Sequence, residues 1–198
     1  PEYEEKLLEI RTRVEQERNA QRILERTEQL ATDAESAENE RQWITSVGLW
    51  NQAIIQIKEV PPSSIEANNA RSLLTTYTGS LEAAQNNMEV ALRFEPIEPS
   101  FFLVCGLNTV QKCSYSLEAG KVRLDLFEGY DAVINESITP PPQRTGLDSD
   151  AQLVSQSNRL LQQVTLLSTQ SQVPVELYDA EGQFLARYRA DLDGFVRQ

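Results

Sequence analysis

The chain has 198 residues, of which 40% are apolar, enough to build a buried core in one domain or two small ones. Its formal net charge of −12 argues against a nucleic-acid partner, which needs clustered Lys and Arg, and against direct adhesion to anionic lipid. It contains no histidine, the commonest general base and transition-metal ligand, and no catalytic or divalent-cation motif stands in for it, so we predict a non-enzyme without cofactor or metal.

Residues 2–39 predict one long helix, because they are mostly Glu, Gln, Arg, Leu and Ala, without Gly or Pro. An apolar seam with the 4-3-4 spacing of a heptad repeat occupies its beginning, at Tyr3, Leu7, Ile10 and Val14. The seam weakens at Glu17 and Gln21, where apolar residues belong. A shift of register of this kind is typical of a stutter, or of a change from self-association to packing on a second helix.

Two interpretations of this helix stay open. In the first it is a coiled coil that makes the protein a homo-oligomer, with the seam residues Tyr3, Leu7, Ile10 and Val14 as the self-association site. In the second it is a long helix that lies against its own neighbours. A second apolar register supports the latter for the C-terminal part, at Ala20, Ile23, Leu30, Ala34 and Ala37.

A helical hairpin is predicted to follow. Residues 39–60 carry one apolar stripe at spacings of three and four, at Trp43, Val47, Trp50, Ile54 and Ile57. Pro61-Pro62 ends this helix, and Ser63 or Ser64 caps a third helix that ends by Pro96. Residues 1–95 thus form a helical, coiled-coil-like stalk.

The hairpin also carries a family resemblance. Its pattern is Trp50-x-x-Ala53-Ile54-x-x-Ile57, then Val60-Pro61-Pro62-Ser63, then Ala70 and Tyr77. It resembles a helical-hairpin motif of cyanobacterial proteins, which often carry it near a membrane anchor. It is also similar to a single tetratricopeptide repeat, although the loop is longer than in that family and no second copy follows. Because solenoid repeats need about three copies to bury their faces, a plain hairpin packed on the first helix is the simpler interpretation.

Residues 96–198 predict a small head, so that the whole chain is of the α+β class. The predicted order is three strands, one packed helix and a closing strand hairpin, at 101–105, 111–117, 122–126, 151–169, 175–178 and 184–188. Residues 130–138 are a short helix or irregular, and 139–150, with a triple proline, are an extended loop. We expect the sheet to be antiparallel, with the helix on one face.

Both cysteines lie in the first part of the head. Cys105 and Cys113 are expected to face each other across a hairpin centred near Thr109. They form either a disulfide or a pair of reduced, packed thiols. A disulfide implies an oxidising compartment, here the bacterial periplasm.

Three classes of function remain. The first is a non-catalytic periplasmic domain of a membrane-anchored protein, which self-associates and binds other envelope proteins. Its anchor is expected outside this chain, before Pro1. The layout resembles the filament septal-junction proteins of cyanobacteria, which implies a structural role in cell–cell communication. The second class is a ligand-sensing input domain of a membrane receptor, and the third is a cytoplasmic tetratricopeptide-type adaptor with reduced thiols.

Overall fold

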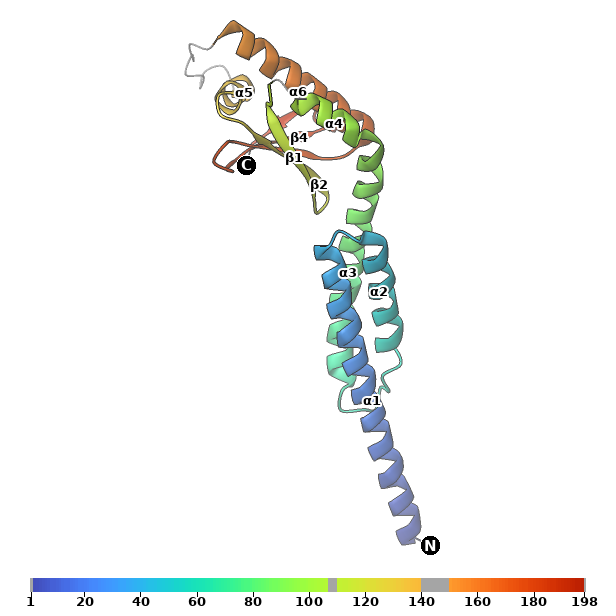
Figure 1. The fold of residues 1–198 in the computed structure, drawn as a ribbon. Coiled ribbons are helices and arrows are strands. Elements are labelled where there is room, and N and C mark those ends of the chain that lie inside the picture. The colour runs from blue at the N-terminus through green and yellow to red at the C-terminus, as the bar shows by residue number, and fades with distance from the viewer. Residues whose placement is uncertain (1, 107–109, 140–149, 198) are drawn as a thin grey trace. The chain divides into compact units, whose positions relative to one another are not determined.

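The computed structural model describes residues 2–106, 110–139 and 150–197 and has the predicted α+β class (Figure 1). The chain divides into two compact units, Pro1–Met88 and Glu89–Gln198. The division falls within helix α3 (Ala67–Phe94), before the boundary expected at Pro96. The last turns of α3 belong to the second unit, because Phe94 is buried in its core.

The first unit contains α1 (Glu2–Asn39), α2 (Trp43–Ile57) and most of α3, as the sequence predicts. The three helices lie side by side, and the N-terminal part of α1 extends past the α2–α3 loop (Figure 1). The turn between α1 and α2 is tight. Arg41 adopts the left-handed conformation there, with φ of 60°, and the Gln42 N–H donates to the Ala37 carbonyl at 2.8 Å.

The core of the first unit is built around Trp50, which is 2% exposed. Its ring packs on Tyr77 of α3 with ring centroids 5.4 Å apart. Ala31 and Ala34 of α1 are buried in the same cluster, and their small side chains leave room for the indole. The predicted stripe of α2 is therefore the face that α2 buries, and the second apolar register of α1 is the one that meets it.

The second unit is organised on one sheet. Among the described residues it has five strands in the order β1 (Cys113–Glu118), β2 (Lys121–Leu126), β3 (Val175–Tyr178), β4 (Phe184–Arg189) and β5 (Gly194–Val196). Neighbouring strands are antiparallel except for β2 and β3, which are parallel. The expectation of a wholly antiparallel sheet is therefore wrong, because the chain returns from β2 to β3 through helices rather than through a tight turn. The short strand β5 was not predicted.

The helices of this unit are α4 (Glu98–Cys105), which follows the 3-10 turn Glu95–Ile97, α5 (Tyr130–Ile138) and α6 (Ala151–Ser171). Helix α6 is the predicted packed helix. Asp150 caps it, since its side chain accepts a hydrogen bond from the Gln152 N–H. The α5 segment takes the helical one of its two predicted alternatives.

Residues 101–105 were expected to be a strand and are instead the body of α4. Phe101, Val104 and Cys105 are buried, whereas Phe102 and Leu103 are 52% and 62% exposed, which is a helical spacing and not an alternating one. A proline in the first turn starts this helix. The predicted three-stranded meander is therefore the two-stranded hairpin β1–β2.

Alternation along the strands divides the sheet into two faces. Val122, Leu124 and Leu177 point into the core, where they meet Leu160 and Val164 of α6. The intervening residues of β2 and β3 are on the opposite, outer face. The predicted hairpin centre at Thr109 and the triple proline at 140–142 lie outside the described residues.

Candidate self-association surface

The first candidate site is the beginning of α1. Every residue from Glu2 to Gln16 is exposed, and the first fully buried residue of the helix is Ala20. We call residues 2–16 the exposed segment. Its support within the chain is local, such as the Lys6–Glu2 ion pair at 3.0 Å. A helix of this length is marginal in water on its own, so packing against a partner is the expected source of its stability.

The seam residues predicted for self-association all lie on this exposed segment. Tyr3, Leu7, Ile10 and Val14 are 75%, 36%, 60% and 43% exposed. Farther along α1, the buried positions Ala20, Leu24 and Ala31 face the helices of the same unit. The change of register near Glu17 therefore marks the point where α1 begins to pack within its own unit, and the seam before it remains available to another molecule.

A hollow adjoins the C-terminal end of the seam. Ile10 and Val14 line it together with Ile65, which comes from the α2–α3 loop and is 78% exposed. Glu17 holds the loop in place, because its carboxylate accepts a 3.0 Å hydrogen bond from the Ile65 N–H. Sequence reasoning did not single out Ile65, whose one signal is an apolar residue in an otherwise polar loop.

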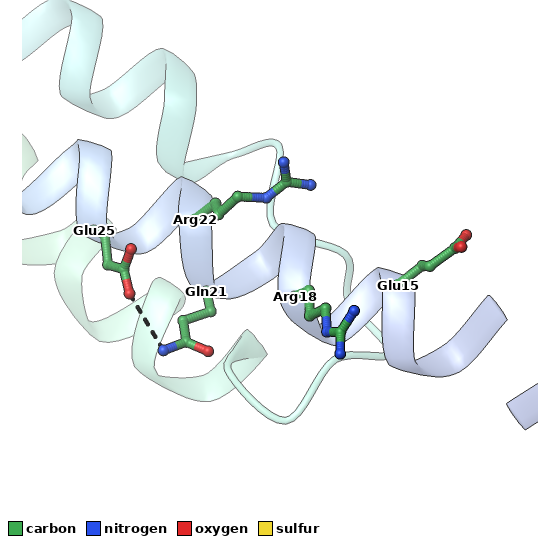
Figure 2. Close-up of a pocket in the computed structure, with 5 residues that line it drawn as sticks. All are labelled: Glu15, Arg18, Gln21, Arg22 and Glu25. Carbon is green, nitrogen blue, oxygen red and sulfur yellow. Dashed lines mark hydrogen bonds between the residues drawn. The ribbon is translucent and has the colours of Figure 1, made fainter. Parts of the chain in front are cut away.

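Charged side chains flank the seam. In a heptad numbered from the seam, Lys6 and Arg13 precede its apolar positions, and Glu4, Arg11 and Arg18 follow them. Four of these five residues are basic in a chain whose net charge is −12. Beyond the seam the exposed side of α1 is polar, with Glu15, Arg18, Gln21, Arg22 and Glu25 along a shallow depression. Figure 2 shows Arg22 extending away from Gln21, which bonds Glu25, so these side chains do not converge on a ligand site.

The second predicted site is the pair of cysteines, and the structure contains the disulfide Cys105–Cys113 with Cα atoms 4.7 Å apart. Its setting differs from the prediction. Cys105 is the last residue of α4 and Cys113 the first of β1, so the bond joins a helix to a strand and does not cross a hairpin. Both residues are buried, and the Lys112 N–H donates to the Cys105 carbonyl at 2.7 Å.

A charge cluster that sequence reasoning missed lies on the outer face of the sheet. Glu176 of the central strand β3 is 2% exposed. Its carboxylate accepts hydrogen bonds from Lys121, from Arg187 Nε at 2.8 Å and from the Tyr178 hydroxyl at 2.7 Å. Burial alone would raise the pKa of Glu176, but these donors outweigh it and lower the pKa to about 2. Tyr178 also carries the Arg123 guanidinium 3.7 Å from its ring centroid.

The arrangement of Glu176 is one of structure rather than of catalysis. A carboxylate held ionised by three donors is a poor general acid or base near neutral pH. The signal for it in the sequence is a single glutamate in an otherwise apolar four-residue strand. That position predicts a charged residue on the outer face but does not identify its partners.

The head has one further depression of interest, of about 290 Å³, near the end of α6. Its charged groups already have partners. Arg187 bonds Glu176, and Arg189 bonds Asp191 with two hydrogen bonds of 2.8 and 2.6 Å. The depression is at the lower limit of ligand pockets, roughly 300–1,000 Å³, and gives little support to a sensor function.

Two searches of the structure concern other classes of site. Within residues 2–106, 110–139 and 150–197, no group of three or more His, Cys, Asp or Glu side chains is placed to hold a metal ion. In the same part of the chain, no helix combines the length and hydrophobicity needed to cross a membrane.

Comparison with protein families, with curated proteins and with solved structures finds no match to this chain. The fold and the surfaces described above are therefore the basis for a proposed function. The resemblance to cyanobacterial hairpin and septal-junction proteins remains a prediction from the sequence pattern.

Proposed function

We propose that this chain is a non-catalytic assembly domain that associates with a second copy of itself through the exposed segment of α1. The observation that carries the proposal is the seam Tyr3, Leu7, Ile10 and Val14. Its heptad spacing continues for two turns beyond the point where the helix stops packing on its own unit. Burying these side chains between two helices removes apolar surface from water, which is the main favourable term in such associations.

We also propose that the domain works in the periplasm, as part of a protein anchored in the bacterial inner membrane by segments outside this chain. The disulfide Cys105–Cys113 supports this compartment, because disulfides persist in oxidising environments and are rare in the cytosol. On the layout resemblance, we propose a structural role in an envelope or cell–cell junction complex, with other envelope proteins as further partners. The acidic net charge favours protein partners over nucleic acid.

Variants of the seam test self-association. The double variant Leu7→Glu, Ile10→Glu places charges on the seam, and we expect it to remain monomeric at concentrations where the unmodified chain associates. The matched control is Leu8→Glu, because Leu8 is 65% exposed on the same segment but lies off the seam. Light scattering after size-exclusion chromatography measures the mass. Equal masses for the double variant and the unmodified chain would contradict the proposal.

The redox state of the cysteines tests the compartment. Native protein taken from its own compartment is alkylated without reductant and analysed by mass spectrometry. We expect no alkylation at Cys105 or Cys113. Two alkylated thiols would contradict a periplasmic location and would favour the cytoplasmic adaptor.

A further inference from the structure

We infer that the two copies associate in antiparallel orientation, with Tyr3 of each copy seated in the hollow formed by Ile10, Val14 and Ile65 of the other. This inference rests on the proposed self-association. It concerns the orientation and the contacts of the partner, and it can fail while self-association stands.

The hollow is the first argument. It is placed at the end of the seam and is lined by three apolar side chains that are each 43% or more exposed. In an antiparallel pair that matches Leu7 with Ile10 of the second copy, Tyr3 of that copy lies opposite Val14. Its aromatic ring then covers the hollow, and its hydroxyl lies near the polar rim. In a parallel pair Tyr3 stays eleven residues from Val14, roughly 16 Å along the helix, and cannot reach it.

The rim of the hollow fits an aromatic side chain. Arg13 and Arg18 border it, and a guanidinium is attracted to the face of a tyrosine ring. Tyr3 is 75% exposed in a single chain, so it is available for this contact.

The flanking charges are the second argument. In a parallel coiled coil the residue before one apolar position meets the residue five places on in the other helix. That geometry pairs Lys6 with Arg11 and Arg13 with Arg18, so every such contact is between like charges. In the antiparallel pair Glu4 meets Arg11 on one side and Lys6 meets Arg13 on the other. Half of the flanking contacts are then between opposite charges, which favours the antiparallel orientation.

Cysteine cross-linking distinguishes the two orientations without altering the seam. An equimolar mixture of the single variants Glu4→Cys and Arg11→Cys is oxidised mildly, and a matched mixture of Lys6→Cys and Arg11→Cys is treated alike. We expect a mixed disulfide-linked dimer in the first mixture only. The native cysteines do not interfere, since they are already joined to each other.

The outcomes separate the inference from the proposal beneath it. A linked dimer in the Lys6→Cys mixture only, or in neither mixture when the unmodified chain has the mass of a dimer, overturns the antiparallel orientation and leaves self-association standing. A monomeric mass for the unmodified chain overturns both.

A second variant tests the hollow itself. Ile65→Ser removes one apolar wall, and we expect it to raise the dissociation constant of the dimer about tenfold, since it is an interface residue in the antiparallel pair only. The control is Ile44→Ser, because Ile44 is 72% exposed on α2 and outside the hollow. An unchanged dissociation constant for Ile65→Ser would overturn the placement of Tyr3.

Discussion

The indole Nε1 of Trp50 donates a 2.7 Å hydrogen bond to Oε1 of Glu38, and so joins α2 to the end of α1. The same oxygen accepts a 2.9 Å hydrogen bond from the Ser46 hydroxyl. The tryptophan that carries the resemblance to a tetratricopeptide repeat is thus engaged within its own unit, where its ring also packs on Tyr77. A peptide partner cannot reach it without opening the helices.

This position of Trp50 gives a stability prediction. Trp50→Ala leaves a cavity between α1, α2 and α3 and removes the donor that Glu38 uses, so we expect a loss of about 3–5 kcal/mol in the free energy of unfolding. Urea unfolding followed by circular dichroism measures it. A near-zero change in the midpoint would show that Trp50 is on an exposed face and would return the peptide-binding interpretation.

The buried Glu176 makes stability depend on pH. Its pKa falls from an ordinary value of 4.5 to about 2 in the folded protein. A lowered pKa stabilises the fold above the unfolded value, so this contribution is fully present above about pH 5 and is lost as the pH falls towards 2. We expect Glu176→Gln to cost about 3 kcal/mol at pH 7, and the difference from the unmodified protein to shrink between pH 5 and 2.

Urea midpoints of both proteins across this pH range test that expectation. Asp125→Asn is the control, because the Asp125–Arg123 pair is on the surface and is worth under about 1 kcal/mol. A difference between Glu176→Gln and the unmodified protein that is constant from pH 7 to pH 2 would contradict the role of the ionised carboxylate.

The disulfide is expected to stabilise the head by closing a short loop. For a loop of this size the chain-entropy relation gives about 2.5 kcal/mol. We expect reductant to lower the urea midpoint of the unmodified protein and to have no effect on the double variant Cys105→Ala, Cys113→Ala. Equal midpoints with and without reductant, at complete reduction, would show that helix packing alone holds α4 against β1.

The α1–α2 turn offers a stabilising substitution. Arg41 has φ of 60°, a conformation that costs a residue with a Cβ roughly 1 kcal/mol and costs glycine little. We therefore expect Arg41→Gly to raise the free energy of unfolding by about 1 kcal/mol. Arg41→Ala removes the same side chain without relieving the backbone and should give no gain. A gain of equal size for both variants would assign the effect to the arginine side chain.

The sequence was most informative where one periodicity ran far. Helix α1 and the stripe containing Trp50 could be predicted because polar helix formers and apolar positions at spacings of three and four repeat over many residues. The strand β2 was equally clear, since Val122, Leu124 and Leu126 alternate with charged residues.

It was least informative where the run was short or the contact was distant. Phe101–Cys105 is too brief to show a period, so its helix was taken for a strand. The pairing of Glu176 with Lys121, 55 residues away, depends on the parallel alignment of β2 and β3, which local sequence does not specify. The contribution of Ile65 to the hollow likewise depends on its loop reaching Glu17.

Sedimentation equilibrium of the unmodified chain over a wide range of concentrations tests the central claim most directly. If the seam of α1 associates with a second copy, the weight-average mass rises with concentration towards twice the mass of one chain. A mass that stays at that of one chain up to the highest concentration would contradict self-association and leave the exposed seam for a different partner.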